Sequence, residues 1–156
     1  MHFLIFSQHF DRERGQDYGR LLLNHLEKGT LNIWVSTSSV ASKQNHEDFH
    51  QRGGLIPPQY RLSNPSQPTK WTVRTRPIAM PSVKGVEGNF YKINPHTVTT
   101  DKGGSRGDFG IHLDANVEGS MGCIVMDSRR FKDYEQKMED LALAGIDEIP
   151  LFVVYS

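Results

Sequence analysis

The chain has 156 residues, a length at which one domain with its own hydrophobic core is expected, and we treat residues 1–156 as a single domain. Its 18 basic and 18 acidic side chains give a formal charge of zero. This argues against a nucleic-acid binder and a polybasic membrane-surface protein, because both are usually basic. The single cysteine excludes an intrachain disulfide and a cysteine zinc cage.

The first residues, Met1–Ser7, contain a short apolar run without a positively charged start, so we do not expect a secretion signal there. No apolar stretch reaches the roughly 20 residues that a membrane-spanning helix needs. We therefore expect no membrane insertion. The small size and the zero formal charge lead us to expect a monomer.

Most of the chain has the pattern of short strands separated by turns. Alternating or β-branched runs predict extended segments at His2–Ser7, Leu31–Thr37, Gln59–Leu62, Trp71–Arg76, Phe90–Ile93 and Ile149–Tyr155. The stretch Tyr18–Gly29 fits either a short helix or a hairpin strand, because its leucines suit both. Segments that are polar or rich in Gly, Pro or Ser are predicted as loops and turns at 38–51, 53–58, 64–69 and 100–107.

One helix is predicted, in the C-terminal half of the chain. Its apolar residues recur on one helical face, at Phe131, Tyr134, Met138 and Leu141. Asp127 or Ser128 can cap its start, and Gly145 can end it. Many short strands with one late helix predict a mainly β fold, either a β-sandwich or a compact barrel.

Cys123 lies in a run of small residues, and His112 precedes it by eleven positions, at the end of a predicted strand. A thiol is mostly protonated near neutral pH, so a nucleophilic cysteine needs a base or a cation beside it. We expect the connection of about ten residues to form a hairpin that brings the His112 ring within hydrogen-bond reach of the sulfur.

The residues before the cysteine suit a turn that stabilises an oxyanion. Gly119 and Gly122 let the backbone approach a carbonyl group closely. The N–H groups of Gly122 and Cys123, with Met121 as a further candidate, are predicted to face the developing negative charge. Ser120 is predicted to fix the turn or to bind substrate.

Three further side chains are candidates for binding substrate. Asp114 lies two residues after His112, on the same face of the strand, where it can also orient the ring. Arg106 has a guanidinium that matches a carboxylate, although a Gly-rich turn is the simpler interpretation of its surroundings. Tyr60 is a candidate contact, with a strand-surface aromatic as the alternative.

Two simpler interpretations compete with these. A lone cysteine is usually a small buried apolar residue, which would make the chain a non-catalytic β-sandwich binding module. The flanking glycines and the upstream histidine favour the nucleophile instead. His46 and His50 have the spacing of helical zinc ligands, but their polar surroundings favour a loop.

Ile111–His112 followed by Gly119–Ile124 resembles the active-site signature of L,D-transpeptidases with a YkuD-type catalytic domain. The segment Gly54–Leu62 resembles an upstream motif of relatives that have a short catalytic domain, some of which are antibacterial effectors delivered into rival cells. The chain departs from the family pattern at Gln59, Leu113, Met121 and Val125.

The resemblance implies a mainly β catalytic domain in which Cys123 is the nucleophile and His112 its base. It implies a peptidoglycan stem peptide as substrate, with transpeptidation or D-amino-acid exchange as the reaction and L,D-carboxypeptidase hydrolysis as the alternative. No metal or organic cofactor is expected. The implied site of action is the periplasm or cell wall, and an effector would also have a delivery or immunity partner.

Overall fold

The computed structural model is mainly β, as predicted, with one α-helix in the C-terminal half. It describes residues 1–9, 19–38, 49–50, 54–63, 70–80, 88–114 and 122–155. The strands are β1 (His2–Gln8), β2 (Gly19–His25), β3 (Gly29–Ser36), β4 (Trp71–Arg74), β5 (Ile78–Met80), β6 (Gly88–Asn94), β7 (Thr97–Thr99), β8 (Ser105–Gly107), β9 (Gly110–Leu113), β10 (Ile124–Met126) and β11 (Glu148–Tyr155). A 3₁₀ turn, η1 (Gln59–Arg61), precedes β4, and the helix is α1 (Ser128–Leu143).

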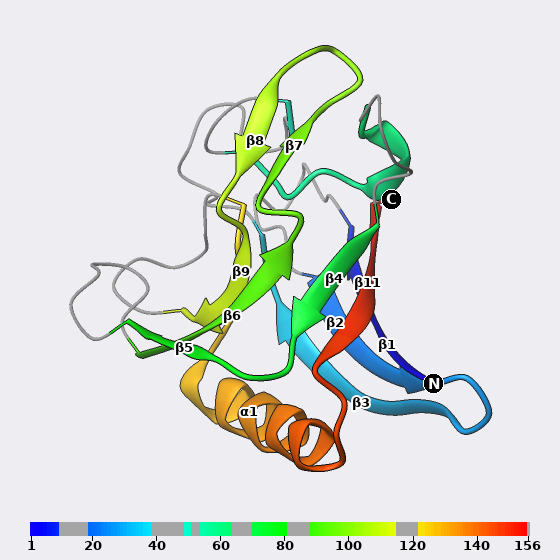
Figure 1. Ribbon diagram of the computed structural model, residues 1–156, viewed down its shortest axis with the longest axis vertical. Coiled ribbons are helices and arrows are strands. Elements are labelled where there is room, and N and C mark those ends of the chain that lie inside the picture. The colour runs from blue at the N-terminus through cyan, green and yellow to red at the C-terminus, as the bar shows by residue number, and fades with distance from the viewer. Residues whose placement is uncertain are drawn as a thin grey trace.

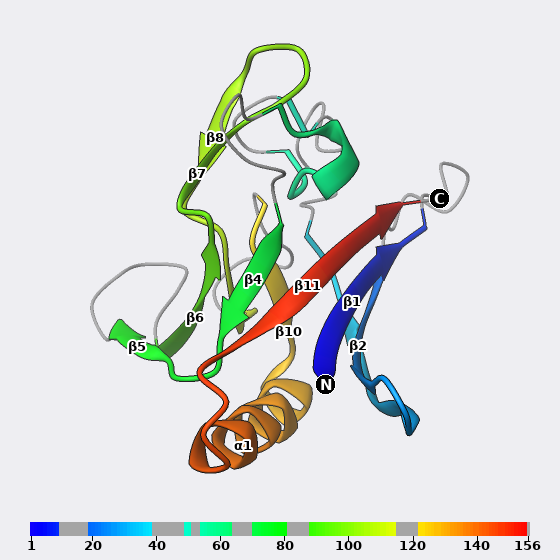
Figure 2. The same cartoon turned by 45° about the vertical axis from the view of Figure 1, so that its right-hand side comes forward.

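The main sheet of the described chain has the strand order β10-β9-β6-β4-β11-β1-β2-β3, with β5 paired to β6. The strands β1 and β11 pair in parallel, and β2 pairs with the other side of β1 (Figure 2). Thr37 follows β3 and forms a bridge to Val125 of β10, with N···O distances of 3.0 and 2.9 Å. This bridge joins the two ends of the strand order, so the sheet closes into a compact barrel.

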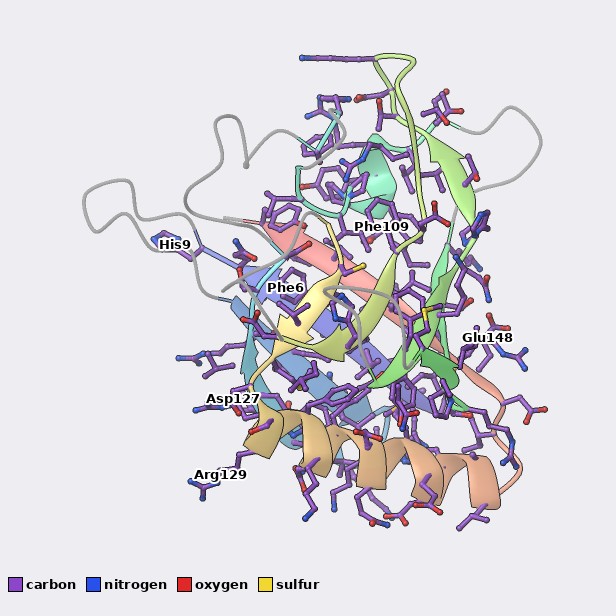
Figure 3. The ribbon with its side chains drawn as sticks, turned by 90° about the vertical axis from the view of Figure 1, so that its left-hand side faces the viewer. Phe6, His9, Phe109, Asp127, Arg129 and Glu148 are labelled. Atoms are coloured by element: carbon purple, nitrogen blue, oxygen red, sulfur yellow. The ribbon has the colours of Figure 1, made fainter. Side chains whose placement is uncertain are left out.

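Alternation along the strands decides which side chains enter the barrel. In β1, Leu4 and Phe6 are fully buried, and in β11 Leu151 and Val153 occupy the same inner face. Phe6 and Phe109 both point into the interior (Figure 3). The strands are therefore held by one hydrophobic core, to which α1 and all the strands except β5 and β8 contribute residues.

The helix α1 lies across one end of the sheet, and the β7–β8 hairpin projects from the opposite end (Figure 1). The predicted cap is correct: the Asp127 carboxylate accepts the N–H of Arg130 at 2.9 Å. Gly145 ends the helix with φ = +86°, a left-handed conformation that favours glycine. The predicted apolar face is buried in full, at Phe131, Tyr134, Met138 and Leu141. In the described ranges, no helix has the length and apolarity to cross a membrane.

Two predictions about local structure are wrong. The segment Gln59–Leu62 is not a strand, because the N–H of Arg61 donates to the Pro58 carbonyl at 3.0 Å and closes a 3₁₀ turn. The segment 100–107 is not entirely a loop, because its last three residues form β8. Within the ambiguous stretch 18–29, the described residues 19–29 form β2, a turn and the first residue of β3. The extended segments predicted from His2, Leu31, Trp71, Phe90 and Ile149 are confirmed as β1, β3, β4, β6 and β11. The loop predicted at 64–69 lies outside the described residues.

Candidate active site

His112 lies on β9, and Cys123 directly precedes β10, which pairs with β9 in parallel. Residue Ile124 pairs with Ile111, and Val125 pairs with His112. Continuing this register by one residue places Cys123 beside Gly110, so that the thiol and the imidazole share one face of the sheet, two positions apart along the strand. The predicted hairpin is wrong, because the chain returns to the start of β9 before β10 begins, and the strands run in the same direction.

This face points away from the main core. On β9 and β10, Ile111, Ile124 and Met126 belong to the hydrophobic core, whereas His112 and Val125 are equally buried but lie outside it. His112 is only 4% exposed, so groups outside the hydrophobic core must cover it. The candidate site therefore lies on the face of β9 and β10 that is turned away from the core, and at His112 this face is shielded from solvent.

The His112 ring is oriented by a backbone group. Its Nδ1 atom lies 2.8 Å from the carbonyl oxygen of Leu113. A carbonyl can only accept, so Nδ1 carries the proton, and in the neutral ring Nε2 is the nitrogen with the lone pair. The ring also stacks against Phe90, with centroids 5.9 Å apart and planes inclined by 26°. The carbonyl of Leu113 is therefore one contact that orients the ring, and the orienting role of Asp114 stays a prediction.

Gly110 makes room for that stacking. A Cβ atom at this position would lie 2.1 Å from Cζ of Phe90 and within 2.6 Å of two further ring carbons. A real Cβ atom does not approach other atoms so closely, so any side chain here would displace the Phe90 ring. The glycine therefore supports the position of His112 indirectly, a role that the sequence analysis missed.

Cys123 is half-buried, and its sulfur lies 3.7 Å from the carbonyl oxygen of Asp108, to which the thiol donates. Asp108 has φ = +61°, and it is the one described residue other than glycine with a positive φ. Its backbone N–H donates to the carbonyl of His96 at 3.0 Å, and its carboxylate lies 3.2 Å from the His96 ring. Asp108 was not predicted as part of the site, although Asp tolerates the left-handed conformation better than most residues.

Gly122 has the turn role that was predicted but not the oxyanion role. Its φ is +110°, and a Cβ would lie 2.7 Å from the Phe109 ring. Its N–H donates to the carbonyl of Ser38 at 3.2 Å, so this donor faces the protein and not an incoming substrate. The predicted role of the Cys123 N–H stays a prediction. Ser120 and Met121 lie outside the described residues.

Ser38 supports the cysteine turn from behind and is fully buried. Its hydroxyl donates to the carbonyl of Gly122 at 2.7 Å and accepts the N–H of Ile56 at 3.1 Å. Its own N–H donates to the side chain of Gln8 at 3.1 Å. The Tyr155 hydroxyl donates to the Ile56 carbonyl at 2.5 Å. The sequence analysis missed Ser38 because these contacts cross between segments far apart in the chain.

Tyr155 keeps its proton over the working pH range. Burial raises the pKa of Tyr155 well above its ordinary value, and the opposing effects of Arg106 and of a hydrogen bond with Ser38 are smaller. The phenol is therefore a neutral donor that fixes the buried segment 54–58.

Arg106 does not have the predicted role of binding a substrate carboxylate. It is 6% exposed, and its guanidinium donates to the carbonyls of Phe49, Gly54 and Leu55 at 2.6, 2.9 and 3.0 Å. It also lies over the Phe109 ring, 5.1 Å from the centroid. These contacts direct the guanidinium to the backbone carbonyls of Gly54 and Leu55, next to Gly122.

The other two predicted substrate contacts lie at the surface. Tyr60 is 65% exposed on η1. Asp114 lines a cavity of about 190 Å³ together with Thr37 and Val125, and its N–H donates to Met126 at 2.8 Å. Asp114 thus borders the same face of β10, and its predicted contact with substrate stays a prediction.

The zinc-like histidine pair is not found as a cluster. His46 lies outside the described residues, and His50 contacts the hydroxyl of Thr100 at 2.7 Å and the carboxylate of Asp101 at 3.5 Å. Of the residues that the structure describes, no three His, Cys, Asp or Glu side chains are gathered as metal ligands.

Comparison of the chain with protein-family models, with curated proteins and with solved structures finds no match.

Proposed function

We propose that this chain is a cysteine acyltransferase that acts on peptidoglycan stem peptides. The observation that carries the proposal is the parallel pairing of β9, which holds His112, with β10, which begins directly after Cys123. Continued by one residue, this register puts both side chains on one face, and Nδ1 of His112 is tied to a carbonyl. This leaves Nε2 as the basic nitrogen. The substrate class comes from the resemblance of the cysteine turn to L,D-transpeptidases.

The reaction has two acyl-transfer steps. The His112 ring takes the proton of the Cys123 thiol, and the sulfur attacks the carbonyl carbon of the bond between a diamino acid and D-alanine. The C–N bond breaks, the imidazolium gives its proton to the leaving amine, and a thioester on Cys123 is formed. An acceptor amine then attacks the thioester, gives a proton to His112 and restores the thiol as the new amide forms.

The fate of the thioester decides between related activities. Attack by the amine of a second stem peptide gives a cross-link, and attack by a free D-amino acid gives exchange. Attack by water gives L,D-carboxypeptidase activity, the hydrolytic outcome expected of a toxin. In each case the site of action is the periplasm or cell wall, and effector-like delivery would require a delivery or immunity partner.

Intact-protein mass spectrometry with a defined tetrapeptide muropeptide or a carbapenem tests the proposal. We expect a covalent adduct on the wild-type protein, no adduct on Cys123→Ala, and formation at least about 10²-fold slower on His112→Gln. An adduct that persists in Cys123→Ala would overturn the proposal. Separation of the products as dimers, exchanged peptides or tripeptides identifies the acceptor.

A further inference from the structure

Arg106 is a buried cation that contacts the segment packed against the cysteine turn. Its hydrogen bonds with Gly54 and Leu55 hold the start of the segment 54–58. That segment reaches the turn a second time, because Ile56 and Gly122 share the hydroxyl of Ser38. The guanidinium is therefore part of the structure on which the turn is built.

The guanidinium also lies close to the turn itself. A Cβ atom on Gly122 would be 2.9 Å from Nη2 of Arg106. Adding one carbon–carbon bond of about 1.5 Å puts Nη2 within about 4.4 Å of the Gly122 Cα atom. Cys123 is the next residue, with its Cα atom about 3.8 Å further along the chain. At such a separation a positive charge still acts on a half-buried thiolate.

We propose that Arg106 is the positioning residue of the cysteine turn, and that its charge favours the ionised form of the Cys123 thiol. The inference rests on the proposed function only in that it concerns the nucleophile of that site. It replaces the carboxylate-binding role predicted from the sequence, since the guanidinium is directed to backbone carbonyls.

Other titratable groups near Cys123 or near Arg106 must be considered as well. His112 on β9 stabilises the thiolate when it is protonated. The carboxylate of Asp108 opposes the thiolate, although it is largely exposed and lies 3.2 Å from the ring of His96. Tyr155 on β11 is neutral because burial raises its pKa. The test must therefore separate the effect of Arg106 from that of His112.

The experiment is the rate of Cys123 alkylation by iodoacetamide between pH 5 and 10, measured on the full chain. We compare wild type with Arg106→Met, which removes the charge, and Arg106→Lys, which keeps the charge but loses the fork of donors. Arg61→Met is the matched control, because Arg61 also stacks on a phenyl ring, at 5.3 Å from Phe49, but is 40% exposed and pairs with Asp101 at 2.5 Å.

The midpoint of the rise in alkylation rate with pH reports the ionisation of the thiol. For wild type we expect this midpoint at least about one pH unit below the free-thiol value of about 8.5. Arg106→Met should raise it by about one unit, which is a roughly tenfold loss of alkylation rate at pH 7. Arg106→Lys should recover most of the shift, and Arg61→Met should behave as wild type. An Arg106→Met protein that is folded by circular dichroism and keeps the wild-type midpoint would overturn the inference.

His112→Gln decides the question if Arg106→Met does not fold. With Arg106 in place, its midpoint should stay below about 8.5, and a return to the free-thiol value would overturn the inference. The proposed function is judged separately by the muropeptide adduct. A midpoint shifted in Arg106→Met, without a muropeptide adduct on wild type, would reject the enzyme activity and keep the role of Arg106. An adduct on wild type with the same midpoint in Arg106→Met would keep the enzyme activity and reject the role of Arg106.

Discussion

The hydroxyl of Ser38 offers a sharp test of how the cysteine turn is held. Its replacement in Ser38→Ala removes the acceptor of the Ile56 N–H and the donor to the Gly122 carbonyl, at a position with no solvent exposure. Each buried polar group left without a partner costs about 1–3 kcal/mol. We therefore expect a loss of about 3 kcal/mol in the free energy of unfolding, which corresponds to a Tm about 6–12 °C lower for a chain of this size.

Ser36→Ala is the matched control. Ser36 is also buried, at 2% exposure, but its hydroxyl makes one long hydrogen bond, to the carbonyl of Trp34 at 3.4 Å. We expect it to lose less than about 1 kcal/mol. Urea unfolding at pH 7, followed by circular dichroism, measures both variants against wild type. Equal losses in Ser36→Ala and Ser38→Ala would refute the reasoning that the two shared hydrogen bonds stabilise the turn.

Gly110→Ala should destabilise the fold by about 1–3 kcal/mol in urea unfolding because its methyl group would overlap the Phe90 ring; if adding Phe90→Leu recovers none of the loss, the steric explanation fails. Asp127→Ala should cost about 1 kcal/mol at pH 7 through the lost cap. The backbone hydrogen bond from Arg130 lowers the pKa of Asp127 in the folded protein. The stabilisation by the cap is therefore complete above the ordinary pKa of 3.8 and is lost as the pH falls through the lower pKa of the folded protein, so an unchanged cost of Asp127→Ala near pH 2 would contradict this. A hydrogen bond from Thr72 lowers the pKa of Glu148 in the same way, so wild type should lose stability relative to Glu148→Gln as the pH falls from about 5 to 3 in thermal melts, and parallel curves would count against that bond.

Local patterns predicted the elements well because they depend on neighbouring residues. The helix was predicted with its cap at Asp127 or Ser128 and its end at Gly145, since periodicity and capping are properties of a short window. The strand β11 was predicted for the same reason, because its alternation of buried and exposed residues is also a local pattern. The failure at Gln59–Arg61 has a local cause too, because the two prolines before it favour a turn that an alternating pattern does not reveal.

The site was predicted in part, and its failures come from contacts across long stretches of sequence. The proximity of His112 and Cys123 was expected, but the parallel pairing was not, because strand direction depends on the path of the connection. The burial of Arg106 and the bonds of Ser38 involve partners tens of residues away. No window of sequence contains such pairs, so the sequence could not distinguish a substrate-binding arginine from one that holds backbone carbonyls.

The parallel pairing of β1 with β11 means that the two ends of the chain must meet before the barrel is complete. During synthesis β11 is made after β1 and β4, so the pairings of β1 and β4 with β11 form only once the residues between them have been made. Folding of this kind is slow, because most of the chain must be ordered before the pairing is gained. A chain that ends before β11 therefore carries Cys123 without the complete sheet.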